Sequence, residues 1–303
     1  RQMCIRDRSF TIEKGRIYGF LGPNGAGKST TMNIMTGYIG ASSGEVIING
    51  HNILEEPEKT KKCIGYLPEI PPLYLDMTVS EYLYFAAELK KIPKADRNAQ
   101  VIKVMELIKL VDMKNRLIKN LSKGYRQRTG LAAAILDFPD IIILDEPTVG
   151  LDPKQIIEIR ELIRKLAKKH TVILSSHILA EVREVCDYIM IISGGKLVAS
   201  DTTENLENMM SGKGQIEVEA KASRDEMDHI IRRTGKIKEV KYRTSASGIT
   251  TAQIIAKGGE DIREELFLAF SHADVPMLTL NQSKTILEEI FLELTQGSGN
   301  RMI

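Results

Sequence analysis

The sequence has little of three things that would each point to a particular class of protein. Its three cysteines are odd in number and far apart, which fits neither a disulfide framework nor a zinc site. No apolar run approaches the roughly 18 residues that a membrane-spanning helix needs, and no stretch resembles a signal peptide. The formal charge of +2 gives no field strong enough to indicate nucleic acid as the main partner. We therefore expect a cytoplasmic protein with no nucleic-acid partner, whose role at any membrane is peripheral.

What the sequence does have is an ordinary globular composition, 43% hydrophobic and 27% charged, and a length sufficient for two domains. In residues 1–212, short apolar strands alternate with helical patterns, which predicts a largely parallel α/β sheet. A helical insertion is expected at about 72–134, where apolar residues recur with a period near 3.6. Residues 213–303 predict a small α+β domain. The strands are expected at 16–21, 44–50, 63–68, 140–145, 171–177, 188–193, 215–220, 237–242 and 250–256, and helices at 30–38, 153–168, 223–233, 260–271 and 284–296.

The stretch GPNGAGKST fits the phosphate-binding loop pattern G-x-x-x-x-G-K-[ST] between a predicted strand and a predicted helix, as that loop requires. Its glycines allow successive N–H groups to point at phosphate oxygens, at the positive end of the helix. We expect Lys28 to reach the β and γ phosphates and the Ser29 hydroxyl to ligate Mg²⁺. The alternative is an unremarkable glycine turn, which the flanking elements disfavour. The expected nucleotide-binding residues are Gly22, Pro23, Asn24, Gly25, Ala26, Gly27, Lys28, Ser29 and Thr30.

A second buried strand, IIIL in IIILDEP, ends in two carboxylates. Asp145 lies where ligands bind in open α/β sheets and is expected to hold the metal through water. Glu146 is suited to polarise the attacking water. Strands commonly end in polar residues, so this pattern is weak evidence alone, but together with the phosphate loop it predicts nucleotide hydrolysis. A small GTPase is disfavoured because no N-K-x-D motif is present.

The polar, basic run LSKGYRQR at 121–128 lies between two helical patterns and completes a set of ordered motifs over about residues 9–210. In this set the chain resembles the ATP-binding subunit of an ABC transporter, which implies a P-loop NTPase fold of the ABC ATPase type with ATP and Mg²⁺ as ligands. The matching motifs are the phosphate loop, a Q-loop position at Glu69, the signature at 121–127, the Asp145-Glu146 pair, the D-loop GLDP at 150–153 and the switch residue His177.

The resemblance implies that two copies of the chain, a homodimer, share each reaction centre. Ser122 and Gly124 would meet the γ phosphate of an ATP held by the partner's phosphate loop. This is physically reasonable, because a helix N-terminus that lacks a phosphate loop of its own is an anion site to which the anion must be brought. Arg126 and Arg128 either add positive potential near the phosphates or are charges of the helix surface.

The remaining roles follow from the same resemblance. His177 would contact the γ phosphate, although a lone histidine after a strand is often only a polar cap. Glu69 would act at the metal with Ser29 and Asp145. The catalytic residues are then Glu146, His177 and Lys28.

Three residues depart from the usual family pattern. The signature reads L-S-K-G-Y instead of L-S-G-G-Q, with Lys123 and Tyr125 at the changed positions, and Glu69 replaces a glutamine. These variants resemble the ABC-2 type exporter branch, as does the segment 284–295. Residues 1–8 resemble a translated sequencing adapter joined to authentic sequence near Ser9. The adenine-stacking aromatic residue of the family would then be missing, which would weaken ATP binding about ten- to hundredfold.

The resemblance also implies an integral-membrane permease as partner and a location on the inner face of the cell membrane. The segment 71–91 of the helical insertion would transmit movement to the permease, with Tyr74, Tyr82, Tyr84 and Phe85 as docking candidates or as ordinary packing residues. One alternative is an ABC ATPase that drives a non-transport membrane process. A nucleic-acid or ribosome-associated ABC ATPase is less favoured, because the chain shows neither a tandem cassette nor sustained heptads.

Overall fold

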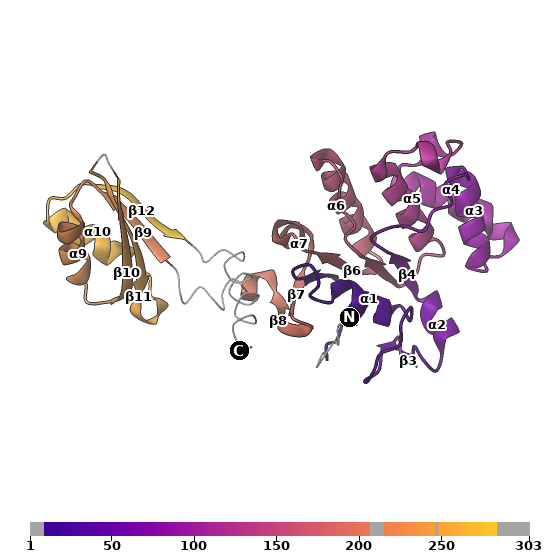
Figure 1. Ribbon diagram of the computed structural model, residues 1–303, viewed down its shortest axis with the longest axis horizontal. Coiled ribbons are helices and arrows are strands. Elements are labelled where there is room, and N and C mark those ends of the chain that lie inside the picture. The colour runs from indigo at the N-terminus through magenta and orange to yellow at the C-terminus, as the bar shows by residue number, and fades with distance from the viewer. Residues whose placement is uncertain (1–8, 207–214, 246–247, 284–303) are drawn as a thin grey trace. The chain divides into compact units, whose positions relative to one another are not determined.

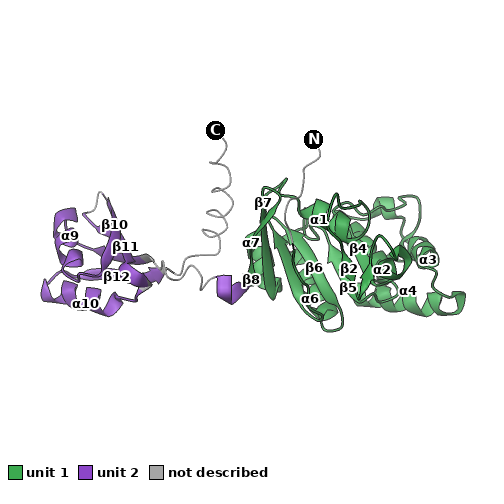
Figure 2. Cartoon of the chain, turned by 90° about the horizontal axis from the view of Figure 1, so that it is seen from below, with its two compact units in different colours: residues 1–201, 297–303 green, residues 202–296 purple. Residues whose placement is uncertain are grey.

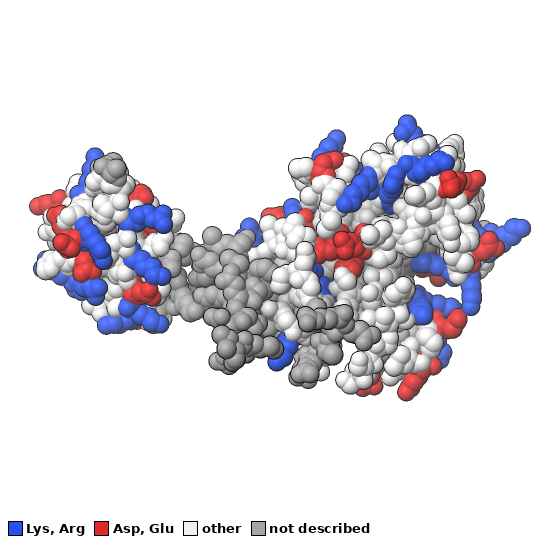
Figure 3. Space-filling model, in the orientation of Figure 1, with Lys and Arg blue, Asp and Glu red and all other residues white. Residues whose placement is uncertain are grey.

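The computed structural model describes residues 9–206, 215–245 and 248–283, and these form two compact units. The first contains the described residues up to Asp201 and the second contains those from Thr202 onward (Figure 2). Residues 1–8, which were expected to be joined to authentic sequence near Ser9, lie outside the described residues. The helix expected at 284–296 lies outside them as well. Basic and acidic side chains are interspersed on the face of the molecule that Figure 3 shows, in keeping with the net charge of +2.

The first unit is built on a six-stranded sheet in the order β4-β5-β6-β1-β7-β8 (Figure 1). Every pairing among β4, β5, β6, β1 and β7 is parallel. All residues of β1 and β6 are buried, because helices cover both faces of such a sheet and near-continuous apolar runs fill it. The predicted α/β class is confirmed. The strands are β1 (Ile17–Leu21), β4 (Ile64–Leu67), β5 (Ile141–Leu144), β6 (Thr171–Ser176), β7 (Tyr188–Ser193) and β8 (Lys196–Thr202).

Helices connect these strands: α1 and α6 lie where helices were expected, whereas α2 and α7 were not predicted. α6 begins at Pro153 after the N-cap Asp152, whose side chain accepts a hydrogen bond from Gln155 N. The strand expected at 44–50 is instead the short hairpin β2 (Ile47–Ile48) and β3 (His51–Asn52). The sequence prediction missed β8, which begins just after the Gly194-Gly195 turn and is half-buried from its second residue onward. The connecting helices are α1 (Lys28–Met35), α2 (Pro57–Lys62), α6 (Pro153–Ala167) and α7 (Leu179–Val185).

Three helices gather at one end of the first unit, in the region where an insertion was expected (Figure 1). α3 starts with a capping box in which Thr78 and Glu81 satisfy each other's backbone N–H groups. The buried residues of α4 include Val101, Val104 and Ile108, which follow the predicted helical period. The elements are α3 (Val79–Leu89), α4 (Lys94–Ile108), the short 3₁₀ turns η1 (Val111–Met113) and η2 (Ile118–Asn120), and α5 (Lys123–Ile135).

The second unit has the element order β-α-β-β-α-β and an antiparallel sheet ordered β10-β11-β9-β12, which is the ferredoxin-like arrangement. Apolar residues of the sheet pack with Met227 of α9 and Phe270 of α10 in one core, so both helices cover the same face. The prediction missed β12. The elements are β9 (Gln215–Ala220), α9 (Arg224–Arg232), β10 (Ile237–Thr244), β11 (Thr250–Ala256), η3 (Lys257–Gly259), α10 (Arg263–His272) and β12 (Met277–Ser283).

Candidate active site

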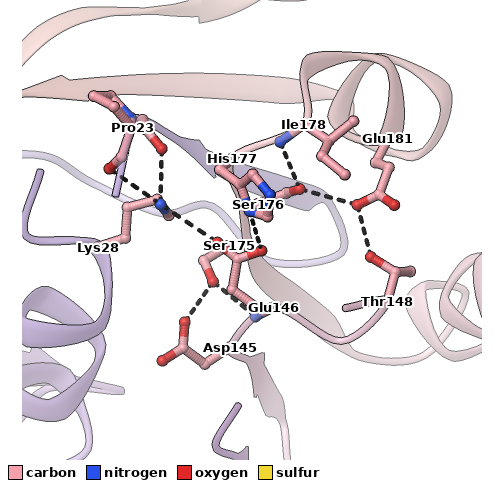
Figure 4. Close-up of polar contacts among 11 residues, drawn as sticks. Pro23, Lys28, Asp145, Glu146, Thr148, Ser175, Ser176, His177, Ile178 and Glu181 are labelled. Atoms are coloured by element: carbon pink, nitrogen blue, oxygen red, sulfur yellow. Dashed lines mark hydrogen bonds and ion pairs between the residues drawn. The ribbon is translucent and has the colours of Figure 1, made fainter. Parts of the chain in front are cut away.

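The residues predicted to act on nucleotide meet at one edge of the first unit's sheet. β1, β6 and β5 are parallel neighbours, so their carboxyl ends lie at the same edge. The phosphate loop follows β1, the two carboxylates follow β5, and His177 follows β6. Figure 4 shows the side chains that these three loops bring together. This is the edge at which open parallel sheets bind their ligands.

The backbone of the phosphate loop takes conformations that require glycine. Gly25 and Gly27 have φ values of +78° and +97°, in the left-handed region that side chains disfavour. At Gly22 an added Cβ would lie 2.4 Å from the carbonyl oxygen of Ile192. α1 begins directly afterwards without a side-chain cap, so the N–H groups of its first turn are available to an anion. The loop is thus shaped to hold a phosphate group.

Lys28 is a buried cation at the centre of the site, with 6% of its side chain exposed. Its Nζ donates a 2.7 Å hydrogen bond to Gly22 O and lies 3.4 Å from Glu146 Oε1. On the other side, His177 Nδ1 lies 3.0 Å from Glu146 Oε2. An ionised carboxylate can only accept, so the histidine nitrogen is the donor of this bond. Glu146 is therefore held between two of the residues that sequence analysis had placed with it, at a backbone φ of +47°.

Ser175 belongs to the site although sequence analysis did not single it out. Its Oγ donates a 2.5 Å hydrogen bond to Asp145 Oδ1 and accepts one of 2.9 Å from Glu146 N. One hydroxyl therefore orients the carboxylate of Asp145 and fixes the unusual backbone of Glu146. The parallel register, in which Leu144 pairs with Leu174, puts Ser175 beside Asp145. A serine one position beyond the paired strand is the signal that could have found it.

The predicted metal ligands share this edge but do not form a closed metal site. Glu69 is exposed two residues beyond β4, and Asp145 is buried one residue beyond the neighbouring β5. Ser29 lies in the first turn of α1. Among the described residues, no three His, Cys, Asp or Glu side chains are grouped to hold a metal ion. Such a sparse set fits Mg²⁺, which keeps several waters and takes phosphate oxygens along with one or two carboxylates.

The tip of α5 carries the signature residues and contacts the D-loop side of the same chain. Ser122 is the N-cap of α5, and an added Cβ on Gly124 would lie 2.3 Å from Gln155 Oε1 of α6. The ammonium group of Lys123 lies against Gly150, where an added Cβ would be 2.0 Å from Nζ. Gly150 has a φ of +71°, so its backbone conformation favours glycine, whereas the flexible end of the Lys123 side chain could move away from an added Cβ. The unusual Lys123 thus links the signature to the D-loop.

The two arginines that follow the signature have partners in their own unit. Arg126 donates to the carbonyl oxygens of Ile118 and Lys119. Arg128 is buried, donates to Ile108 O and forms an ion pair with Glu158 of α6. The expectation for Arg128 is corrected: it is neither a surface charge nor a free source of positive potential, because a carboxylate pairs with its guanidinium in the interior.

Among the residues that the structure describes, we find no helix with both the length and the apolar character required to cross a membrane.

Comparisons with known proteins agree with the geometry. A model of the family described as ABC transporter matches residues 5–149. The bacitracin transport ATP-binding protein BcrA of Bacillus licheniformis is 38% identical over 208 residues, which are 68% of this chain and 67% of that protein. The linearmycin resistance ATP-binding protein LnrL of Bacillus subtilis is 30% identical over 296 residues, covering 97% and 94%. The uncharacterized ABC transporter ATP-binding protein YhcH of Bacillus subtilis is 44% identical, and the match spans 63% of its length.

Solved structures give the same result for the first unit. An ATP binding subunit of an ABC transporter superposes with a TM-score of 0.61 at 30% identity, covering 66% of this chain and 84% of that one. A dimeric ATP-binding cassette in a post-hydrolysis state with ADP and Pi has a TM-score of 0.58 at 25% identity, covering 64% and 88%.

A parallel sheet with a phosphate-binding loop at one strand end and paired carboxylates at another defines the first unit as a P-loop NTPase. The sequence relatives make the assignment specific: the chain belongs to the ABC transporter family. It is an ATP-binding subunit of that family, an ATPase that powers a membrane transporter, and the expected resemblance is confirmed.

Proposed function

We propose that two copies of this chain hydrolyse ATP between them and thereby drive an ABC-2 type exporter whose membrane pathway is a separate permease. The observation that carries the proposal is the Lys28–Glu146–His177 arrangement at the edge of a phosphate-binding loop, in which Lys28 and Glu146 are buried and the His177 side chain is 40% exposed. A dimeric cassette among the structural neighbours supports the pairing of two copies. The signature tip supports it as well, because Ser122 and Gly124 form a helix N-terminus without a phosphate loop of its own.

In this proposal the residues exchange partners when ATP enters. Lys28 leaves Gly22 O and Glu146 for the β and γ phosphates, which frees Glu146 Oε1 to accept a proton from the attacking water. His177 keeps the other oxygen of Glu146 oriented and contacts the γ phosphate. Mg²⁺, bound through Ser29, Asp145 and Glu69, supplies charge neutralisation of the phosphates when present.

Two copies placed head to tail would complete each site with Ser122 and Gly124 of the partner. The γ phosphate would then hold the two copies together. When hydrolysis removes the γ phosphate, the two copies would separate. Hydrolysis is thereby converted into a displacement of one copy relative to the other.

The exporter branch is favoured by the names of two relatives, which refer to bacitracin transport and linearmycin resistance. The variant residues Glu69, Lys123 and Tyr125 point to the same branch. We propose that the cargo of the transporter is an antibiotic or a compound of similar size.

Contact with the permease is proposed at the segment 70–75, which lies between the Q-loop position and α3. Ile70 and Tyr74 are 83% and 56% exposed, and Leu75 is also exposed, although all three are apolar or aromatic. Tyr82, by contrast, is buried and donates to Pro72 O, so packing accounts for it. A permease bound here would hold the chain on the inner face of the cell membrane.

Phosphate release by the purified full-length chain tests the proposed chemistry. We expect Mg²⁺-dependent ATP hydrolysis that is lost in Lys28→Ala, and co-purification with a multi-span membrane protein. Retained hydrolysis in Lys28→Ala would contradict the assignment of the site. A partner other than a membrane permease would contradict the exporter.

A further inference from the structure

A buried carboxylate outside the predicted motifs joins two loops of the site. Glu181 lies near the start of α7, with its side chain among the buried polar residues of the unit. Its Oε2 accepts hydrogen bonds from Thr148 Oγ1 at 2.6 Å and Ser176 Oγ at 2.9 Å. Ser176 Oγ in turn accepts a 3.0 Å bond from Ile178 N (Figure 4). One carboxylate oxygen therefore connects the loop after β5 with the last residue of β6, where the loop that carries His177 begins.

These two loops carry the residues that meet at the reaction centre. Thr148 is two residues beyond Glu146, and Ser176 directly precedes His177. The 3.0 Å contact between Glu146 and His177 thus joins the same two chain segments that Glu181 connects through Thr148 and Ser176. If the tie is removed, each loop is free to move relative to the other, and the distance between the two catalytic side chains is no longer fixed.

Stability alone does not account for a carboxylate at this position. A buried charge is costly to desolvate, and apolar residues of similar size commonly stabilise a protein better. Arg160 of α6 lines one small cavity with Thr148, Ser175 and Glu181. Among the described residues, the buried Nε of Arg160 has no hydrogen-bond acceptor, so it does not form a direct pair with Glu181 through that atom. Hydroxyl groups are the direct partners of the carboxylate.

We propose that Glu181 is a positioning residue for ATP hydrolysis: by holding Thr148 and Ser176 at one oxygen, it keeps His177 against Glu146. The inference rests on the proposed function, since it assigns Glu181 a role in that site's chemistry. Glu181 itself does not contact the reacting atoms. Its effect reaches the substrate through the geometry of the two loops.

The test is steady-state ATP hydrolysis by the full-length chain and its variants, with nucleotide binding measured separately. Glu181→Ala is expected to lower kcat by about ten- to hundredfold, since a small misplacement of catalytic groups has effects of this size, with KM within about threefold. Glu181→Gln keeps an acceptor oxygen for both hydroxyls and should stay within about threefold of the wild type. Glu184→Ala is the control, because Glu184 is exposed on the same helix.

A double-mutant cycle with His177→Ala separates positioning from general destabilisation. If Glu181 acts through His177, then adding Glu181→Ala to His177→Ala lowers kcat by less than about twofold more. Equal losses in both backgrounds would mean that Glu181 only supports folding, and would overturn the proposal. An unchanged kcat in Glu181→Ala would overturn it as well.

Hydrolysis by the wild-type chain distinguishes a failure of this inference from a failure of the proposed function. No hydrolysis by the wild type contradicts the function itself. Normal hydrolysis by both the wild type and Glu181→Ala contradicts the positioning role alone.

Discussion

The two compact units differ in the kind of side chain that they bury. The first unit buries ionisable side chains at one edge of its sheet, including Lys28, Asp145, Glu146 and Glu181. In the described part of the second unit, the buried polar side chain is that of Thr250, and its hydroxyl donates a hydrogen bond to Ala222 O. The rest of that core is apolar. The first unit thus carries a costly arrangement that the described residues of the second unit do not show.

The buried charges of the first unit lie where they have a chemical use, and each of them has a partner. Lys28, Glu146 and His177 form a chain of contacts, and the Ser175 hydroxyl joins Asp145 to the backbone N–H of Glu146. Glu181 forms a separate network with the hydroxyl groups of Thr148 and Ser176. The second unit needs no such network, since helices over one face of a sheet suffice to bury its apolar side chains. We therefore expect substitutions in the first network to change turnover, and substitutions in the second core to change stability.

The largest effect is expected for Glu146→Gln. Removing the group that accepts the proton should lower turnover by about 10²- to 10⁴-fold, the usual range for general base catalysis. ATP binding and ATP-dependent dimers should persist, because the amide keeps the shape of the carboxylate. Phosphate release and light scattering after gel filtration measure the two properties. Glu161→Gln, an exposed position on α6, is the control. Turnover at the wild-type rate would remove Glu146 from its assigned role.

In the second unit, Phe270→Ala should cost about 3 to 5 kcal/mol of that unit's unfolding free energy, since the ring is fully buried. Denaturant unfolding of the full-length chain followed by circular dichroism should show an earlier transition for this unit. ATP turnover of the first unit, measured below that transition, should stay within about twofold of the wild type. A large loss of turnover in Phe270→Ala would contradict the expectation that substitutions in the second unit's core change stability and not turnover.

A smaller effect is expected for Ser175→Ala. The variant deprives Asp145 Oδ1 and Glu146 N of one shared hydroxyl, and buried groups left in this way cost about 1 to 3 kcal/mol. We expect kcat to fall by about tenfold or more while ATP affinity changes little, because the phosphate loop is untouched. Isothermal titration with a non-hydrolysable ATP analogue gives the affinity. Weaker binding with unchanged kcat would show that Ser175 serves the nucleotide instead of the carboxylates.

The smallest effect is expected at an exposed polar pair away from the site, where Thr78→Ala removes the N-cap of α3. The loss should be about 1 kcal/mol of unfolding free energy at neutral pH, with turnover unchanged. Hydrogen bonds from the backbone N–H and then the hydroxyl of Thr78 lower the pKa of Glu81. A lowered pKa stabilises the fold above the unfolded pKa, and this contribution is lost as the pH falls through the folded value.

The difference between wild type and Thr78→Ala should therefore shrink when urea unfolding is repeated in acid. A difference that grows in acid would contradict the ionised capping box.

Much of the architecture followed from local patterns in the sequence. The strands β1, β4, β5, β6 and β7 are apolar runs that end in Gly, Pro or polar residues, so both their existence and their boundaries could be predicted. β12 was missed because its sequence, MLTLNQS, alternates only weakly between apolar and polar residues. β8 was missed because its sequence, KLVASDT, has only a short apolar stretch and ends in polar residues, in keeping with a strand that is exposed at its first residue and half-buried after it.

The residues of the candidate site, too, could be predicted only in part from the sequence. Lys28, Asp145, Glu146 and His177 could be placed from the sequence because each follows a strand or belongs to a spaced motif. Ser175 and Glu181 could not, since their importance depends on partners about 30 residues away in the chain. The pairing of Arg128 with Glu158 was missed for the same reason. Local patterns predict where a side chain lies, but its partners are set by the packing of distant segments.

The most direct test of the central claim is a mixing experiment with two inactive variants. One chain carries Lys28→Ala in the phosphate loop, and the other carries Ser122→Ala with Gly124→Val at the signature tip. If each reaction centre combines the phosphate loop of one copy with the signature of another, then mixed dimers contain one intact centre. Random mixing should restore up to about a quarter of the wild-type hydrolysis rate. Each variant alone should stay inactive. A mixture as inactive as its components would show that both parts must come from one chain, and would contradict the account.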